Sequence, residues 1–343
     1  MELSIEKGGC QMIDITPIDT ALQALSRLPV QTNFLVARSW TAADTALCLA
    51  TAIGYTLTLG LAFVLFNRVN GVQRSMNRKK KDLKEKLENF SPSHPDVKDI
   101  KILVAGQIGA GKSSFINSVD SVFQGRISSR AIVNSAAGFD HSFTQDLKGF
   151  TVRSGKKKLP FILKDIMGLE AEVLKGSQVE DIISIVFGHV KDGYKFNKDQ
   201  PLTREDQHYI SDPSLSEQSF CLVYVIDANT VQFTDDKLID KLKIIRRRIS
   251  DEGIPQVVVM TKVDEACPLI QENLKKLYSS KKIKEQMELC SAKVGVPLTN
   301  IFPVKNYHNE IDTNDDVDVL ILKALEQIVQ LADDRLEDID SET

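Results

Sequence analysis

The residues Gly106–Ser113, which read GQIGAGKS, have the types and the spacing of a loop that holds phosphate groups. Glycines allow backbone N–H groups to turn inward around phosphate oxygens, and a helix that follows adds the partial positive charge of its N-terminus. Lys112 would neutralise the β- and γ-phosphates, which gives it a catalytic role, and the Ser113 hydroxyl would bind Mg²⁺. A glycine-rich turn that only caps a helix is the alternative, but a strand is expected before the loop and a helix after it, which favours a nucleotide-binding P-loop. The expected phosphate-side contacts are Gly106, Gln107, Ile108, Gly109, Ala110, Gly111, Lys112, Ser113 and Ser114.

A second phosphate-side motif, Asp165–Gly168 with the sequence DIMG, follows an apolar stretch that is expected to be a strand. The D-x-x-G spacing would let Asp165 hold Mg²⁺, directly or through water, and would let the Gly168 N–H meet the γ-phosphate. On its own the motif is weak, because an ordinary turn explains it equally well. Its position after a strand and downstream of the P-loop predicts the metal-side acid of the same site.

The residues Thr261–Asp264, which read TKVD, follow the apolar run 256–260 and match the pattern [NT]-K-x-D, with Thr261 in its first place. Asp264 can accept two hydrogen bonds from guanine, and adenine lacks one of the two donors. A buried acceptor left unpaired costs about 1–3 kcal/mol, so Asp264 would select GTP over ATP. The stem of Lys262 would cover the base. Because ligands bind at the carboxyl ends of parallel strands, the three motifs are predicted to meet at one edge of the sheet.

The loop that contacts the edge of the base is expected after the last strand, at Lys305–Tyr307, with Asn306 as the contact. Ser291–Lys293 (SAK) copies the sequence that is usual for that loop. It follows a helical segment, however, whereas the loop should follow a strand. We therefore expect no base contact from SAK.

The first switch segment is expected within residues 126–150. Thr144 is the candidate for the threonine that binds Mg²⁺ and the γ-phosphate, and Ser142 is a close alternative. Leu169 stands where many small GTPases carry a glutamine that orients the attacking water, which argues against rapid hydrolysis. Glu170 could substitute for that glutamine, although an exposed loop acid explains it as well. No arginine finger can be assigned.

Apolar stretches alternate with amphipathic ones from residue 99 onward, which predicts an α/β fold, a P-loop NTPase G domain with a mostly parallel sheet. Strands are expected at 100–105, 150–152, 159–163, 220–226, 256–260 and 301–304. Helices are expected at 112–123, 179–190, 235–249, 269–289 and 317–332. The residues Tyr194–Ser219 are a long irregular insertion whose role the sequence does not reveal.

Residues 46–66 carry no charge. As a helix they would be about 31 Å long, close to the roughly 30 Å of a bilayer's hydrocarbon core. Lysines and arginines follow this stretch, so the positive-inside rule places the downstream chain in the cytoplasm. We therefore expect a short helical, membrane-spanning N-terminal segment and a single-pass, membrane-anchored protein. A buried helix or hairpin of a soluble helical domain, in a soluble cytoplasmic protein, is the alternative.

The chain thus divides into five predicted parts. Residues 1–45 are an N-terminal segment of unassigned structure, 46–66 the membrane span, 67–98 a basic juxtamembrane segment and linker, 99–332 the G domain, and 333–343 an acidic tail that is solvated and frayed. The net charge of −4 argues against a nucleic-acid binder, which is usually strongly basic. The five cysteines are odd in number and lack a C-x-x-C pair, which suits a reducing compartment.

Several stretches resemble the interferon-induced protein 44 family of GTP-binding proteins. They are Ile102–Gly125, Leu159–Leu169, Asp212–Gln218, Tyr224–Ala228, Asp318–Leu325 and Ala332–Asp338. The resemblance implies a cytoplasmic GTP-binding region from about Phe90 to the C-terminus, expression induced by interferon, and a role in the immune or antiviral response. The site residues that it implies are Gly106, Gly109, Gly111, Lys112, Ser113, Asp165, Gly168, Thr261, Lys262 and Asp264. The family's usual β-rich N-terminal interaction domain is not recognisable, and a short segment with the predicted span stands in its place.

These observations predict a Mg²⁺-dependent protein that binds GTP and GDP and hydrolyses GTP slowly. The alternative is a GTP-binding interaction module without meaningful turnover, and Asp264 argues against an ATP-using P-loop enzyme. The expected partners are guanine nucleotide, a membrane through residues 46–66, and protein partners or a second copy of the chain. Nucleic acid is not expected.

Overall fold

The structure is a computed structural model that describes residues 76–131, 146–170, 177–197 and 200–342. Within these residues six strands form one sheet in the order β2-β3-β1-β4-β5-β6. The strands are β1 (Ile100–Gly106), β2 (Lys148–Ser154), β3 (Lys157–Asp165), β4 (Cys221–Asp227), β5 (Gln256–Thr261) and β6 (Ile301–Pro303). Neighbouring strands are parallel except β2 and β3, which pair antiparallel. The predicted α/β fold with a mostly parallel sheet is confirmed.

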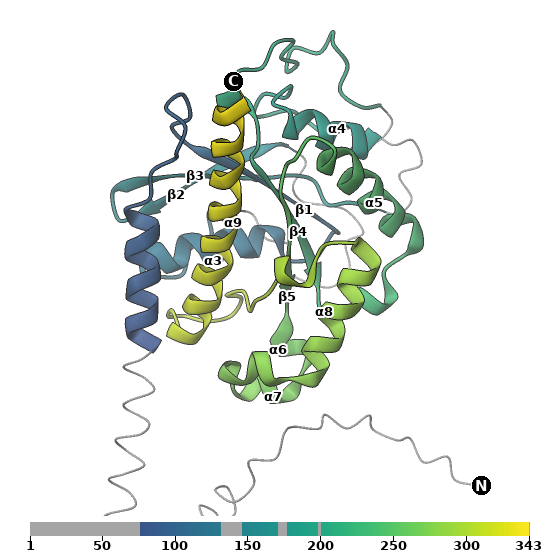
Figure 1. Cartoon of the computed structure of the whole chain (residues 1–343). Helices are drawn as coiled ribbons and strands as arrows, with labels where there is room; N and C mark the ends of the chain where they lie inside the picture. Colours follow the sequence, from purple (N-terminus) through teal and green to yellow (C-terminus); the bar gives the residue numbers. More distant parts are fainter. Residues whose placement is uncertain (1–75, 132–145, 171–176, 198–199, 343) are drawn as a thin grey trace, which may run out of the picture. The chain divides into compact units, whose positions relative to one another are not determined.

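Helices cover both faces of this sheet (Figure 1), because side chains of successive strand residues point to opposite sides. Ile102 and Val104 of β1 belong to the core beneath α3 (Lys112–Gln124) and α9 (Asp315–Glu342), and Leu103 and Ala105 belong to the core on the other face. That second face is covered by α4 (Ser177–Val186), α5 (Asp236–Ser250) and α8 (Lys281–Val294). The expected helical region 269–289 is divided into α7 (Pro268–Glu272), the 3-10 helix Leu274–Ser279 and α8, after the short α6 (Val263–Ala266).

The segment predicted as a juxtamembrane linker contains a helix that is part of the α/β unit. Residues 76–88 are helical, and Leu87 is 2% exposed in the core beneath α3 and α9. Lys80 and Lys86 form ion pairs with acids of α9, and the amine of Lys84 donates to the carbonyls of Val122 and Phe123 in α3. The predicted domain start at residue 99 is therefore wrong. The basic run looks like a solvated face in the sequence because the acids that pair with it lie far along the chain.

The acidic C-terminal tail predicted from residue 333 is also wrong, because α9 continues to Glu342. Ala332 and Leu336 are both fully buried, and their spacing of four residues extends the apolar stripe of the helix. Asp333 accepts a hydrogen bond from the Ser93 N–H at 2.9 Å, which ties the helix to the chain that enters β1.

The described part of the insertion Tyr194–Ser219 is attached to α4 through a buried carboxylate. Asp181 is 1% exposed and accepts the Leu202 N–H at 2.7 Å and the Tyr194 hydroxyl at 3.3 Å. Burial raises the pKa of Asp181 to about 6. At the far end of the insertion the Ser219 N–H donates to the Val186 carbonyl at 2.8 Å. The insertion is thus held against α4 at three points.

Two pairs of hydrogen bonds hold the chain on either side of residues 132–145. The Asn117 side chain in α3 bonds both to the carbonyl and to the N–H of Ala131, each at 2.8 Å. The Leu147 N–H donates to the Tyr194 carbonyl, and the Gly193 N–H donates to the Leu147 carbonyl, again each at 2.8 Å. The segment in which the switch threonine is predicted therefore leaves from α3 and returns beside the insertion.

The predicted membrane span at 46–66 and the N-terminal segment 1–45 lie outside the described residues. Among the residues that the structure does describe, no helix combines the length and the apolar character needed to cross a bilayer.

Candidate nucleotide-binding site

The loop Gly106–Ser113 joins β1 to α3 in the conformation that its glycines were expected to allow. Gly109 and Gly111 have φ angles of 75° and 93°, which side chains rarely adopt. Gly111 is the N-cap of α3, and no described side chain caps this end of the helix. The first N–H groups of α3 are therefore available to an anion, and the partial positive charge of the helix N-terminus favours one.

Lys112 is folded back into this loop. Its side chain is 7% exposed, and its amine donates to the carbonyls of Gly106 and Gln107, each at 3.1 Å. Burial lowers the pKa of this amine to about 8, and the nearby Asp165 carboxylate opposes that change. The amine is thus a cation held by backbone oxygens at the phosphate loop, with a charge that an added anion would stabilise.

Two of the three predicted metal ligands, Ser113 and Asp165, lie within the described residues and contact each other beside the loop. The Ser113 hydroxyl donates to a carboxylate oxygen of Asp165 at 2.8 Å, and Asp165 is 2% exposed. A hydroxyl and a carboxylate are hard oxygen donors of the kind that Mg²⁺ binds together with phosphate oxygens and water. The residues therefore fit Mg²⁺. The third predicted ligand, Thr144, and its alternative Ser142 lie outside the described residues.

The DIMG motif is attached to the P-loop by a backbone contact. The Leu169 N–H donates to the Gly106 carbonyl at 2.9 Å, and residues 107 and 169 form a parallel bridge. At Gly168 a Cβ atom would lie 2.5 Å from the Ile108 side chain, so this close approach needs glycine. The Leu169 side chain is 1% exposed in the core beneath α4 and α5. It is a core residue and cannot orient a water molecule.

The TKVD motif meets the P-loop on its other side. The Thr261 hydroxyl donates to the Ala110 carbonyl at 2.6 Å and is fully buried. Lys262 has a φ of 55°, in the left-handed region, and its amine pairs with Asp227 at 2.8 Å. Asp227 ends β4 and was not among the predicted site residues. Its signal in the sequence is an acid at the carboxyl end of an apolar run, which is also the position of Asp165 at the end of β3.

The loop after β6 reaches the same place, as predicted. The Asn306 amide donates to the Gly111 carbonyl at 3.1 Å, and the Lys305 amine lies 3.5 Å from the Asp264 carboxylate. Glu310 and Asp264 raise the pKa of Lys305, although burial opposes them. The loop that carries Asn306 is therefore joined by side-chain contacts both to the P-loop and to Asp264.

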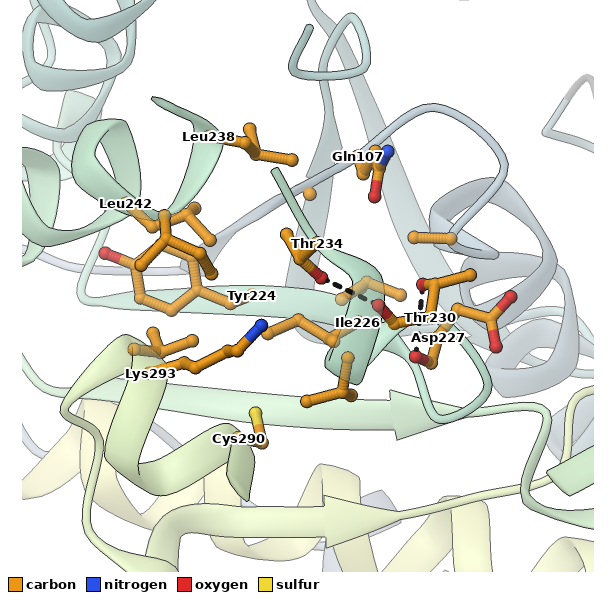
Figure 2. A pocket seen from close by; sticks show the side chains of 16 residues that line it. Gln107, Tyr224, Ile226, Asp227, Thr230, Thr234, Leu238, Leu242, Cys290 and Lys293 are labelled. Atoms are coloured by element: carbon orange, nitrogen blue, oxygen red, sulfur yellow. Dashed lines mark hydrogen bonds between the residues drawn. The ribbon is translucent and has the colours of Figure 1, made fainter. Parts of the chain in front are cut away.

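Ser291–Lys293 lies inside α8, so the helix that was expected to end at residue 289 continues through SAK. Lys293 instead reaches a largely apolar cavity between β4, α5 and α8 (Figure 2). Tyr224, Leu238 and Cys290 contribute to the lining, and Gln107 of the P-loop lies at its edge. Gly106, Gln107 and Ala110 of the P-loop belong to the lining, whereas Lys112, Asp165 and Asp264 do not, so the cavity adjoins the predicted site at the P-loop.

No protein-family model matches the chain. Among curated proteins, human interferon-induced protein 44-like is 33% identical over 79% of this chain and 62% of its own length. Human interferon-induced protein 44 is 36% identical over 76% of this chain and 58% of its own length. Mouse interferon-induced protein 44 is 33% identical over 75% of this chain and 60% of its own length. These relatives confirm the resemblance found in the sequence. The chain spans about three fifths of their length.

Solved structures that resemble the chain include a probable GTP-binding protein named EngB, with a TM-score of 0.36 and 13% identity over 68% of this chain and 98% of that one. Translation elongation factor SelB from Methanococcus maripaludis, in complex with a GTP analogue, has a TM-score of 0.35 and 12% identity over 70% of this chain and 34% of its own chain. Both TM-scores are too low to support a conclusion about the site.

The lowered pKa of Lys112 predicts a pH dependence for the binding of a nucleotide. A bound phosphate favours the charged amine and raises its pKa, so above pH 8 binding must take up a proton. We expect the affinity for Mg²⁺-GTP to fall between pH 8 and 9, by at most about tenfold per unit. Fluorescent-nucleotide titrations from pH 7 to 9 measure this. Lys112→Met should bind more weakly and without the fall, and identical pH profiles for the two proteins would contradict the prediction.

Proposed function

The chain is homologous to the interferon-induced protein 44 family over about three quarters of its length, and on that premise we propose that it binds guanine nucleotides together with Mg²⁺. The observation that carries the proposal is the contact between the two halves of the site. Thr261 and Asn306 bond to the P-loop carbonyls of Ala110 and Gly111, so the base-reading loops and the phosphate loop form one connected edge.

Each end of a nucleoside triphosphate then has a matching group. Lys112 and the N-terminus of α3 would bind the phosphates, and Ser113 with Asp165 would hold Mg²⁺, which neutralises the phosphate charge when it is bound. At the base end of the nucleotide, Asp264 would accept hydrogen bonds from the two guanine donors. The Lys305 amine lies beside Asp264, and an ionised carboxylate only accepts hydrogen bonds. Adenine offers no such pair of donors, so the geometry supports GTP and GDP over adenine nucleotides.

The choice of base can be tested with the full chain. We expect fluorescent GTP to bind at least about tenfold more tightly than ATP, because adenine would leave the half-buried Asp264 carboxylate without the two guanine donors. Asp264→Asn should shift the preference toward xanthosine nucleotides, since the amide can donate to the second xanthine oxygen. Thr234→Ala, which lies outside the predicted contacts, is the control. Equal binding of ATP and GTP by the unmodified chain would sink the guanine assignment.

Slow hydrolysis of GTP is the turnover that we propose. Lys112 and a bound Mg²⁺ would stabilise charge on the transferred phosphoryl group, and Thr144 is retained as the proposed switch residue. Leu169 is buried in the core, so the position that often orients the attacking water is apolar. Glu170 is the residue that could replace the water-orienting glutamine. Its backbone carbonyl accepts a hydrogen bond from the Lys241 amine at 2.6 Å, which fixes the backbone there. This apolar position is the specific observation that favours a second candidate, a GTP-binding interaction module without meaningful turnover.

Phosphate release from GTP separates the two candidates. We expect release far below one turnover per second, against the roughly 1–10³ per second of typical enzymes. Lys112→Met should abolish whatever release the full chain shows, since the charge that it provides is lost. Phosphate release that persists in Lys112→Met does not come from this site. In that case the GTP-binding interaction module without turnover becomes the better proposal.

A role in the interferon response is proposed from the names of the relatives, which describe those proteins as interferon-induced. The chain spans about three fifths of their length, so the activities and partners of the whole relatives do not carry over automatically. Measuring transcript and protein before and after interferon treatment of cells tests the induction, which no site residue determines. Protein partners and self-association belong to the same proposal.

A membrane anchor at residues 46–66, with the nucleotide site in the cytoplasm, also stays a proposal, supported by the uncharged stretch and by the basic residues that follow it. We expect the full chain to stay in the membrane pellet after alkaline carbonate, whereas a chain beginning at residue 76 should remain in the supernatant. Release of the full chain by carbonate would show that it is not an integral membrane protein.

A further inference from the structure

We propose that the helix of residues 76–88 supports the nucleotide site. In this proposal Lys80 fixes the position of the loop Lys305–Tyr307 through its contact with Asp318, which in turn bonds to Tyr307. The proposal rests on the proposed guanine-nucleotide function and adds a positioning residue to it. Lys80 lies outside the predicted G domain and touches none of the predicted nucleotide contacts. Its influence would pass through one buried carboxylate.

Asp318, in the first turn of α9, is that buried carboxylate. It has no exposed surface, and its two oxygens contact groups from different parts of the chain. One oxygen lies 2.7 Å from the Lys80 amine, and the other accepts the Tyr307 hydroxyl at 2.6 Å. The Lys80 amine also lies 2.8 Å from Asp315. Asp318 and Asp315 both raise the pKa of Lys80, although burial opposes them. The lysine therefore compensates two acids, one of which has no access to water.

Tyr307 carries this link into the loop that follows β6. Its ring is 6% exposed, and its hydroxyl oxygen accepts the Asn314 N–H at 2.7 Å. Its own N–H donates to the Ser118 hydroxyl in α3 at 2.9 Å. Tyr307 is thus held at both its backbone and its hydroxyl, and it directly follows the expected base contact Asn306. A shift of Tyr307 would move Asn306 away from its 3.1 Å contact with Gly111.

Burial makes the link depend on Lys80. A carboxylate without water needs a compensating charge, and removing one partner of a buried pair leaves the other charge uncompensated. Without Lys80, the hydroxyl of Tyr307 would be the remaining side-chain contact of Asp318 in the described structure, and Asp315 in the same helical turn would add repulsion. The cheapest relief is for the start of α9 and the Asn314 turn to open toward water, which releases the Tyr307 hydroxyl. The loop Lys305–Tyr307 would then lose its fixed position.

The same helix provides a matched control. Lys86 also pairs with an acid of α9, Glu326, at 2.8 Å, but Lys86 is 60% exposed and Glu326 has a second partner in Lys323 at 2.6 Å. Removing Lys86 therefore leaves Glu326 compensated, and neither residue contacts the loop after β6 in the described structure. Lys80→Met and Lys86→Met change the charge of the helix equally, but only the first removes the support of Asp318.

The test uses the full chain and two readouts, the affinity for Mg²⁺-GTP and the hydrogen exchange of the Asn314 amide without nucleotide. We expect Lys80→Met to weaken GTP binding about tenfold and to speed the exchange at Asn314, whereas Lys86→Met stays within about twofold. Lys80→Arg, which keeps the charge, should recover most of the affinity. Because an uncompensated Asp318 could unfold the chain, Lys80→Met is also combined with Asp318→Asn, which removes the buried charge and should restore folding.

Tyr307→Phe distinguishes positioning from simple stabilisation. If Lys80 acts through the Tyr307 hydroxyl, Lys80→Met should weaken GTP binding by less than about threefold in a Tyr307→Phe background. Full additivity of the two substitutions, or a Lys80→Met protein that melts earlier but binds GTP and exchanges Asn314 normally, would overturn the proposal. Failure of the unmodified chain to bind GTP would refute the proposed function instead, while the exchange at Asn314 would still decide whether Lys80 holds the loop.

Discussion

The carbonyl oxygen of Gly106 is the point on which two parts of the site converge. It accepts the Lys112 amine at 3.1 Å and the Leu169 N–H at 2.9 Å, and the two lone pairs of a carbonyl allow both bonds at once. The backbone can come this close to β4 only without a side chain, since a Cβ at Gly106 would lie 2.2 Å from the Val225 oxygen. A larger residue would separate β1 from β4 and displace the lysine and the metal-side loop together.

The remainder of the site extends this use of backbone oxygens. Thr261 bonds to the carbonyl of Ala110 and Asn306 to that of Gly111. With the bond from Leu169 to Gly106, segments at the ends of three strands share the acceptors of one short loop. The parallel sheet makes this possible, because the carboxyl ends of β1, β3, β5 and β6 lie at the same edge. Each of these loops is therefore held by a hydrogen bond to the P-loop.

The residues that sequence reasoning found are those whose chemistry is encoded locally. Glycine, lysine and serine at fixed spacing in Gly106–Ser113 define the phosphate loop, and Asp165 and Asp264 each follow a recognisable buried strand. The pairs that it missed join residues that are distant in the chain. Lys80 and Asp315 are 235 positions apart, so a basic run looked like a solvated linker. The partner of Lys262, Asp227, ends another strand, β4, and the acidic tail was misjudged because Leu336 was not recognised as a core residue.

The hydrogen bonds at Ala131 and Leu147 have a consequence for the way in which a ligand could act on the chain between them. Asn117 lies four residues after Ser113 in α3, so the Ser113 hydroxyl and the anchor at Ala131 are joined by one helical turn of about 6 Å. The other anchor, Leu147, directly precedes Lys148, the cross-strand partner of Asp165. Both anchors are therefore built on the elements that carry the metal-side residues. A ligand bound at Ser113 and Asp165 would therefore lie on the same two elements, α3 and the β2–β3 pair, that hold the chain at residues 131 and 147.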